Sequence, residues 1–225
     1  NGQLIRDYMK SHQVNLITDS DTAGTQRHIN WINKNGERLS FIINSGTFEP
    51  QLDQSRLNTL IQQSDIVHLS IVNYARHFIP IAREHNKSLW MDLHDYDGKN
   101  PYYDDFIAGG DIIFLSDDAM PDNRAFMENM ITEGKQAVIC THGKRGSTAL
   151  TSNGRWIETP ILTYEYVDSN GAGDAFISGC LYGYTQGYDI DKWLKMGTVA
   201  GGLCITSKEL ASPDLSPQVI ESEYT

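Results

Sequence analysis

The chain has 225 residues, and 18 Lys and Arg residues against 29 Asp and Glu residues give it a net charge of −11 at pH 7. A negative charge of this size repels phosphate backbones and anionic lipid surfaces, which excludes binding to nucleic acid or a membrane through a broad basic surface. Apolar residues make up 40% of the chain, which is enough to form a hydrophobic core and disfavours wholesale disorder.

The apolar runs are short, reaching four residues at 112–115 and 137–140, whereas a membrane span needs about 18. The cysteines are Cys140, Cys180 and Cys204. They are far apart and form no Cys-x-x-Cys pair, so neither a zinc site nor a disulfide framework is supported. With no secretory leader in the first residues, we expect a cytoplasmic protein with buried free thiols.

Residues 2–12 have the apolar spacing of a short helix. Two amphipathic extended stretches follow, at 25–32 and 39–43, separated by a segment that contains Asn35-Gly36. Asn-Gly is a strong turn signal because both residues tolerate positive φ, so the sequence predicts a β-hairpin here.

From residue 53 onwards, short apolar runs alternate with helical patterns, which predicts βαβ units and a buried parallel sheet. The predicted strands are 66–70, 89–93, 111–115 and 137–141. The predicted helices are 53–63, 73–86, a short one within 94–109, and 122–133. A second hairpin is predicted at 147–150 and 155–159, with its turn at Asn153-Gly154, and is followed by helices at 173–186 and 190–206. The polar tail after Ser207 is expected to pack only in part.

The most informative segment is the glycine-rich turn at 168–176, Asp-Ser-Asn-Gly-Ala-Gly-Asp-Ala-Phe. A glycine turn that opens a helix presents free backbone N–H groups at the positive end of the helix dipole, where an anion such as phosphate binds. Asp174 directly follows the glycines. It is either a helix-start residue that satisfies free N–H groups or a general base beside a phosphate site.

This Gly-Ala-Gly-Asp segment resembles the second signature of the ribokinase-like carbohydrate kinases, the PfkB family. Two further stretches, 111–118 and 138–146, resemble the family's strands around the nucleotide site and stand in family order. The resemblance extends over about residues 14–215. It implies an α/β fold of three layers (α/β/α) with a mostly parallel central sheet and a small β lid. The implied organisation is a single kinase domain over 1–225, with the lid at about 22–45 and the core at 53–215.

The resemblance also implies an activity, the transfer of the γ-phosphate of Mg-ATP to a hydroxyl of a sugar or sugar-like molecule. Asp174 takes the role of the catalytic base. The backbone N–H groups of Gly171, Ala172 and Gly173 form the anion hole that stabilises developing phosphoryl charge.

Further site residues follow from the same resemblance, with ATP and Mg²⁺ as the implied cofactors. The expected nucleotide contacts are Thr141, Gly143, Gly146, Thr198 and Gly201. Asp168 and Ser169 stand where the family often places a monovalent cation such as K⁺. Asp92 and His94 end a predicted strand, where open α/β sheets bind their ligands, and are candidates to line the acceptor pocket. Ordinary loop polarity explains them equally well.

Two departures from the family pattern stand out. The Asn-x-x-Glu motif that orders magnesium is replaced by Ser116-Asp117-Asp118-Ala119. Asp117 or Asp118 is a substitute ligand through water, and the alternative, which we favour, is that Ser116 or Asp117 caps the next helix. The family's N-terminal strand and its Gly-Gly-x-x-Asn sugar motif are also missing, so we expect either a truncated chain or a lost acceptor site.

These departures leave two alternatives to a sugar kinase. One is a catalytically silent family member that binds a nucleotide or sugar, and the other is a vitamin kinase of the same superfamily that acts on a pyridoxal-like or pyrimidine alcohol. The two hairpins favour the carbohydrate branch by resemblance. The expected partner is a small-molecule sugar, with no nucleic acid or membrane, and the first hairpin is expected to pair two subunits in a homodimer.

Overall fold

The computed structural model describes residues 2–32, 38–120 and 122–223. The chain divides into two compact units, 1–54 and 55–225, and this boundary falls close to the predicted change of pattern at residue 53. In the first unit, helix α1 (Gly2–Ser11) precedes the antiparallel pair β1 (Arg27–Ile32) and β2 (Arg38–Asn44). The pair is the predicted first hairpin, and its expected Asn-Gly turn lies outside the described residues.

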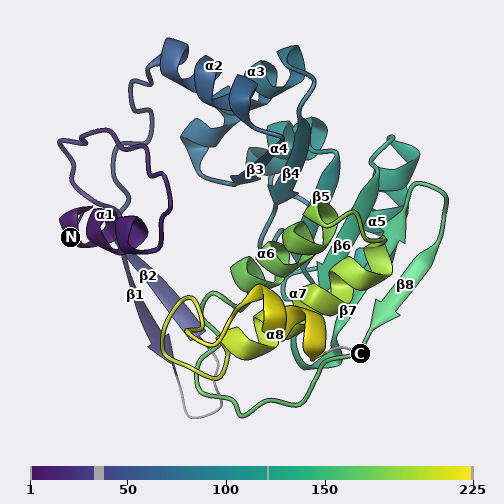
Figure 1. Cartoon of the computed structure of the whole chain (residues 1–225). Coiled ribbons are helices and arrows are strands. Elements are labelled where there is room, and N and C mark those ends of the chain that lie inside the picture. Colours follow the sequence, from purple (N-terminus) through teal and green to yellow (C-terminus); the bar gives the residue numbers. More distant parts are fainter. Residues whose placement is uncertain (1, 33–37, 121, 224–225) are drawn as a thin grey trace. The chain divides into compact units, whose positions relative to one another are not determined.

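The second unit is built around a six-stranded sheet with the order β3-β4-β5-β6-β7-β8 (Figure 1). The parallel strands are β3 (Ile66–Ser70), β4 (Ser88–Asp92), β5 (Ile112–Ser116) and β6 (Ala137–Thr141). The antiparallel strands β7 (Ser147–Thr151) and β8 (Trp156–Thr159) extend the sheet from β6. This is the predicted mostly parallel α/β sheet followed by the second hairpin.

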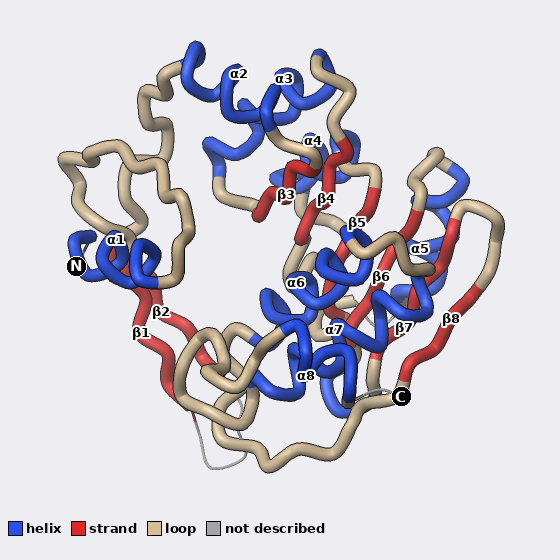
Figure 2. Tube along the Cα trace, in the orientation of Figure 1, coloured by secondary structure: helices blue, strands red, loops and turns tan. Residues whose placement is uncertain are grey.

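Helices cover both faces of this sheet, which gives three layers (Figure 2). One face packs against α2 (Gln54–Gln63), the turn η1 (Asn73–His77), α3 (Phe78–Glu84), α4 (Asp104–Gly109) and α5 (Asn123–Thr132). A short turn, η2 (Pro101–Tyr103), precedes α4. The other face packs against α6 (Ala172–Thr185) and α7 (Ile190–Cys204). Successive side chains of β4 point to opposite faces of the sheet. Met91 therefore packs in the hydrophobic core on the first face, and Trp90 packs in the core on the second face.

One element was missed from the sequence, the C-terminal helix α8 (Pro217–Ser222). The tail packs only in part, as expected, and its contact is made by Ile220, which is buried and packs with residues of α7 such as Met196. The start of α8 carries a recognisable signal. The Ser216 side chain accepts a hydrogen bond from the Val219 N–H at 3.3 Å, and Pro217 occupies the first turn.

Helices α6 and α7 lie side by side (Figure 1), and glycines bring their backbones into contact. A Cβ atom added at Gly179 would lie 2.4 Å from the Met196 carbonyl oxygen, and one at Gly197 would lie 2.8 Å from the Phe176 carbonyl oxygen. Neither position accepts a larger residue without moving a helix. This packing fixes α6 on the sheet and therefore fixes the glycine turn at its N-terminus.

We predict that Gly179→Ala lowers the free energy of unfolding by about 1–3 kcal/mol, because the added methyl group overpacks the contact between the helices. Urea denaturation followed by circular dichroism measures the change. Gly173→Ala is the matched control on the same helix, since a Cβ there meets no atom within 4 Å. Equal stability of the two variants would contradict this account of the helix pair.

Candidate active site

Polar side chains gather at the carboxyl end of the parallel sheet. Each of the four parallel strands ends on a polar residue, and these are Ser70, Asp92, Ser116 and Thr141. Because parallel strands point the same way, these ends share one edge of the sheet, which is where open α/β folds bind their ligands.

Asp92 and His94 form a hydrogen-bonded network with Ser70 at this edge. The Asp92 Oδ1 atom accepts from the His94 backbone N–H at 2.9 Å, and its Oδ2 atom lies 3.5 Å from His94 Nε2. The same Nε2 atom lies 2.9 Å from the Ser70 hydroxyl. The structure thus brings the two predicted acceptor-site residues together and adds a third.

His94 has a left-handed backbone conformation, with φ of 53°. Such a conformation is unfavourable for a residue with a Cβ and persists where the surrounding structure imposes it. Here the hydrogen bond to Asp92 and a second one, from the Ser116 N–H to the His94 carbonyl oxygen at 2.7 Å, hold the backbone in place. The observed strain marks this turn as a candidate functional position.

Burial and charge set the electrostatics of the cluster. Asp92 is buried, and its desolvation raises the pKa of the carboxyl group, while His94 opposes the shift and Asp174 adds to it. His68 on β3 keeps solvent-accessible surface, yet desolvation lowers the pKa of its ring, and the charges of Asp92 and Asp174 oppose that shift. Asp174 therefore lies within electrostatic reach of both residues.

The glycine turn enters α6 through a conformation that requires glycine. Gly171 stands at the N-cap position with φ of 83°, and a Cβ there would lie 2.8 Å from the Leu210 carbonyl oxygen. By contrast, a Cβ at Gly173 would meet no atom within 4 Å. The back of the turn is therefore closely packed and its front is open, with the exposed Asp174 in the first turn of the helix.

The N–H groups predicted to form an anion hole are not equally available. The Ala172 N–H donates to the Ser169 carbonyl oxygen at 3.2 Å, so an anion would compete with that bond. Asp168 Oδ1 accepts from the Asn170 N–H at 2.9 Å. The two residues predicted to hold a monovalent cation thus take part in the hydrogen bonding of the turn itself.

Cys204 packs behind the glycine turn at the end of α7. Its thiol donates weakly to the carbonyl oxygens of Asn170 and Leu210, each at 3.5 Å. Burial raises the pKa of this thiol, and the nearby carboxylates of Asp174 and Asp168 add to the shift. The group therefore stays a neutral thiol that supports the turn from behind.

The residues predicted to contact the nucleotide fall into two groups. Thr141 ends β6, and Gly143 begins the turn η3 (Gly143–Arg145) with φ of 54° and no atom within 4 Å of an added Cβ. Gly146 follows with φ of 94°, and a Cβ there would lie 2.1 Å from the Thr159 carbonyl oxygen. Gly146 therefore allows β7 and the end of β8 to approach, while Thr141 and Gly143 lie at the carboxyl edge of the parallel strands.

Thr198 and Gly201 form the second group, and both lie within α7. The Thr198 side chain is buried and donates to the Leu194 carbonyl oxygen at 2.9 Å. A Cβ at Gly201 would lie 3.1 Å from the Ala172 carbonyl oxygen. In this structure both residues serve helix packing, and Gly201 supports the glycine turn.

The residues predicted to replace the magnesium motif differ in their surroundings. Asp117 is largely buried and accepts hydrogen bonds from His142 and Arg145. Asp118 is exposed, with the Ser116 hydroxyl 3.4 Å from its Oδ2 atom. In the part of the chain that the structure describes, no three His, Cys, Asp or Glu side chains group in a way that could hold a metal ion.

Two residues of this edge were missed from the sequence, Ser70 and His68. Ser70 ends β3 just as Asp92 ends β4, so the rule that singled out Asp92 applies to it equally. His68 carries no local signal, because its relation to Asp92 and Asp174 arises only once the strands and α6 are assembled.

Comparison with known proteins agrees with this architecture. Residues 1–217 match the description "pfkB family carbohydrate kinase". Acarbose 7(IV)-phosphotransferase from Actinoplanes sp. is 29% identical over 216 residues, which cover 91% of this chain and 70% of that protein. Fructoselysine 6-kinase from Escherichia coli is 28% identical over 146 residues, which cover 64% of this chain and 55% of that protein.

Solved structures show the same fold. A microbiome-derived acarbose kinase superposes with a TM-score of 0.88 at 28% identity, covering 98% of this chain and 76% of that one. Ribokinase from Thermotoga maritima superposes with a TM-score of 0.75 at 16% identity, covering 97% and 75%. The chain belongs to the pfkB family of carbohydrate kinases. No helix in the described parts of the chain has the length and apolar character to cross a membrane.

The raised pKa of Asp92 predicts a pH-dependent stability. Because the folded state binds the proton more tightly than the unfolded state, stability falls as the pH rises from the unfolded pKa, about 3.9 for Asp, through the raised folded value. Asp92→Asn removes this titration and keeps an oxygen to accept from the His94 N–H. Urea denaturation across this pH window should show the wild-type protein losing more stability than the variant, and parallel curves would contradict the assignment.

Proposed function

We propose that this protein transfers the γ-phosphate of Mg-ATP to a hydroxyl of a sugar or sugar-like molecule. One observation carries the proposal. The carboxylate of Asp174 follows an open glycine turn at the start of α6 and lies within electrostatic reach of Asp92 at the strand ends. A general base, an anion-binding turn and an acceptor-site carboxylate thus belong to one cluster.

In the proposed reaction, Asp174 accepts the proton of the acceptor hydroxyl. The acceptor oxygen then forms a bond to the γ-phosphorus, the bond from that phosphorus to the β–γ bridging oxygen breaks, and ADP leaves. The N–H groups of the turn, with those of Gly171 and Gly173 foremost, stabilise the charge on the transferred group. Positioning and fixed dipoles supply most of the catalysis in such a transfer.

The acceptor binds at the strand ends in this proposal. The Asp92 carboxylate is suited to accept hydrogen bonds from sugar hydroxyls, and His94 and Ser70 keep that carboxylate and the turn after β4 in place. Burial of Asp92 strengthens any hydrogen bond it makes there, because the surrounding dielectric is low.

Magnesium enters this reaction as part of the Mg-ATP substrate. The described residues offer no cluster of three ligands for a resident ion, and magnesium in kinase sites keeps several waters and binds through substrate phosphates with one or two carboxylates. Asp118 is an exposed carboxylate close to the end of β5 and is the candidate contact through water. A potassium ion at Asp168 and Ser169 stays a prediction from the family resemblance.

The relatives indicate the class of acceptor. Acarbose 7(IV)-phosphotransferase and fructoselysine 6-kinase are named for carbohydrate-derived acceptors, which favours the carbohydrate branch over a vitamin kinase. Acarbose and fructoselysine therefore belong in the acceptor panel, beside simple sugars, sugar phosphates and nucleosides. The alternative is a silent protein that binds a nucleotide or sugar without transferring phosphate. ADP release with any acceptor of the panel would exclude this alternative, and absence of release with all of them would support it.

We predict that ADP release from Mg-ATP depends on one of these acceptors, and that Asp174→Asn lowers kcat about 10²- to 10⁴-fold while ATP still binds. This is the range that a positioned general base contributes. The measurement is a coupled assay of ADP release together with calorimetric titration of ATP.

Glu128→Gln on α5 is the matched control, since it makes the same carboxylate-to-amide change at an exposed position. Activity retained in Asp174→Asn would remove the proposed base. Absence of ADP release with every acceptor, with ATP bound normally, would instead support the silent binding protein.

The first hairpin, formed by β1 and β2, has an apolar surface suited to contact with a second copy of the chain. Its exposed apolar side chains include Ile29, Trp31, Leu39, Phe41 and Ile42. Apolar side chains of this number on a two-stranded hairpin are typical of an interface. We extend the proposal to a homodimer formed through β1 and β2.

Replacing Trp31 and Phe41 together by Ser should raise the dissociation constant of the dimer, so that the variant sediments as a monomer at concentrations where the wild-type chain is a dimer. Analytical ultracentrifugation across a concentration series measures this. Exchange of Leu4 for Ser, also exposed and apolar but outside the hairpin, is the control. A wild-type chain that stays monomeric at all concentrations would rule out this interface.

A further inference from the structure

The loop between β6 and β7 is tightly folded on itself. The His142 N–H donates to the Gly146 carbonyl oxygen at 2.8 Å, and the Gly146 N–H donates to the Gly143 carbonyl oxygen at 3.2 Å. The Arg145 N–H completes the turn by donating to the His142 carbonyl oxygen at 3.1 Å. These bonds shape residues 142–146 but do not by themselves fix the loop on the sheet.

Asp117, at the end of the neighbouring strand β5, joins this loop to the sheet. Its Oδ2 atom accepts from His142 Nδ1 at 2.9 Å and from Arg145 Nη2 at 2.5 Å. Its backbone N–H donates to the Thr141 carbonyl oxygen at 3.1 Å. One residue therefore holds both ends of the η3 turn against the strand ends.

His142 extends the network to the other side of the loop. Because a carboxylate can only accept, Nδ1 carries the proton of this hydrogen bond. In the neutral ring, Nε2 then accepts from the Thr148 hydroxyl on β7, 2.9 Å away. The Asp117, His142 and Thr148 side chains are mostly buried, whereas Arg145 is 73% exposed. The network is therefore internal, with a guanidinium group on its solvent side.

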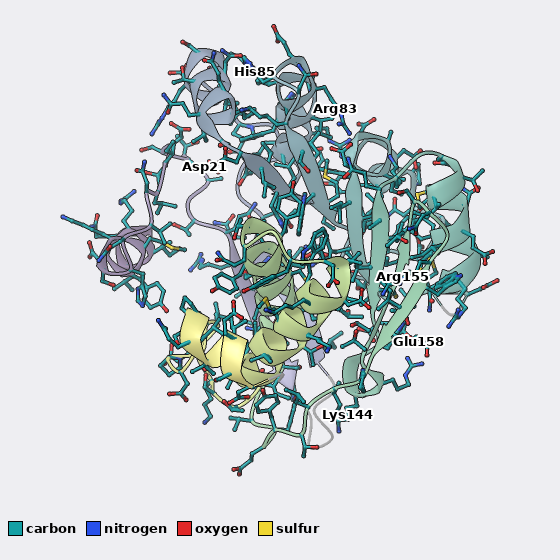
Figure 3. The ribbon with its side chains drawn as sticks, turned by 45° about the vertical axis from the view of Figure 1, so that its right-hand side comes forward. Asp21, Arg83, His85, Lys144, Arg155 and Glu158 are labelled. Atoms are coloured by element: carbon teal, nitrogen blue, oxygen red, sulfur yellow. The ribbon has the colours of Figure 1, made fainter. Side chains whose placement is uncertain are left out.

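The loop lies where a nucleotide would bind under the proposed function. The space in front of Gly143 is open. Lys144, labelled in Figure 3, places its ammonium group 5.8 Å from the centre of the Tyr166 ring, in the segment that leads into the glycine turn. The η3 turn thus lies beside the segment that precedes the glycine turn.

The surroundings of Asp117 do not favour a metal ion. A protonated guanidinium group beside the carboxylate repels a second cation, and both donors converge on the same oxygen atom. We propose that Asp117 is a positioning residue, which together with His142 holds loop 142–146 as a rigid wall of the nucleotide site. This inference rests on the proposed function and gives Asp117 a role other than the two considered from the sequence, a magnesium ligand through water or the favoured helix cap, since Asp122 caps α5 instead.

Calorimetric titration of a non-hydrolysable ATP analogue, with magnesium and again with EDTA, tests the proposal. We expect Asp117→Asn and His142→Ala each to weaken binding about tenfold in both conditions, which corresponds to a loss of about 1.4 kcal/mol in binding free energy. The double variant should bind no more weakly than the weaker single variant, because both changes break one network. Glu158→Gln is the matched control, since it breaks the ion pair of Glu158, labelled in Figure 3, with Arg124, and both of these side chains are mostly exposed.

A loss of binding confined to the magnesium condition, with His142→Ala unaffected, would identify Asp117 as a metal ligand and overturn the proposal. Unchanged binding in both single variants would overturn it as well. If the wild-type protein does not bind the analogue, the proposed function fails first and the inference with it. If the wild-type protein binds the analogue and both single variants bind it equally well, only the inference about Asp117 is refuted.

Arg145→Ala is a further test variant that we expect to fold normally, because the Arg145 side chain is mostly exposed. We expect it to weaken binding of the analogue by a few-fold and to speed hydrogen exchange at the His142 and Gly146 amides. Wild-type binding together with wild-type exchange rates in this variant would also contradict the proposal.

Discussion

The close approach of α6 and α7 is the constraint on which the rest of the site depends. Glycines on both helices let one backbone touch the other, with Gly179 against the Met196 carbonyl and Gly201 against the Ala172 carbonyl. The second contact lies at the first residue of α6, directly beside the glycine turn. The packing of the two helices therefore also sets the geometry of the site, and a larger residue at either position would move the turn that carries Asp174.

A second constraint is that the strands of the sheet are apolar along their length and polar at their carboxyl ends. The interiors of the central strands are completely buried, and the polar groups at their ends are held by bonds between neighbouring strands or to the turns that follow. Asp92 shows the consequence most clearly. The burial that raises the pKa of its carboxyl group also makes it a strong and well-positioned hydrogen-bond acceptor, because the low local dielectric strengthens each bond that it forms.

The local sequence pattern predicted those helices and strands whose formation depends only on which of their residues are buried. The alternation of short apolar runs with helical spacing located β3 to β6 and most helices, and the Asn153-Gly154 turn located the second hairpin, because these signals act over a few residues. Helix α8 was missed since its buried face depends on Ile220 packing against α7, which no local period of a polar tail reveals.

The candidate site was predictable only where a motif or a strand end marked it. Asp174 and the glycines stand in one contiguous segment, and Asp92 and His94 end a strand. The partners of Asp117 lie 25 and 28 residues further along the chain, so no local pattern could show that a guanidinium and an imidazole share its oxygen. The left-handed backbone of His94 is held in part by the Ser116 N–H, a hydrogen bond that only the assembled sheet supplies.

A crystal structure of the protein with a non-hydrolysable ATP analogue and the acceptor found active is the most direct test of the proposed active site. We expect the terminal phosphate to lie against the N–H groups of the glycine turn, and one acceptor hydroxyl to lie within hydrogen-bond reach of the Asp174 carboxylate, about 2.6–3.2 Å. A terminal phosphate bound elsewhere, or an acceptor hydroxyl that meets a different base, would contradict it.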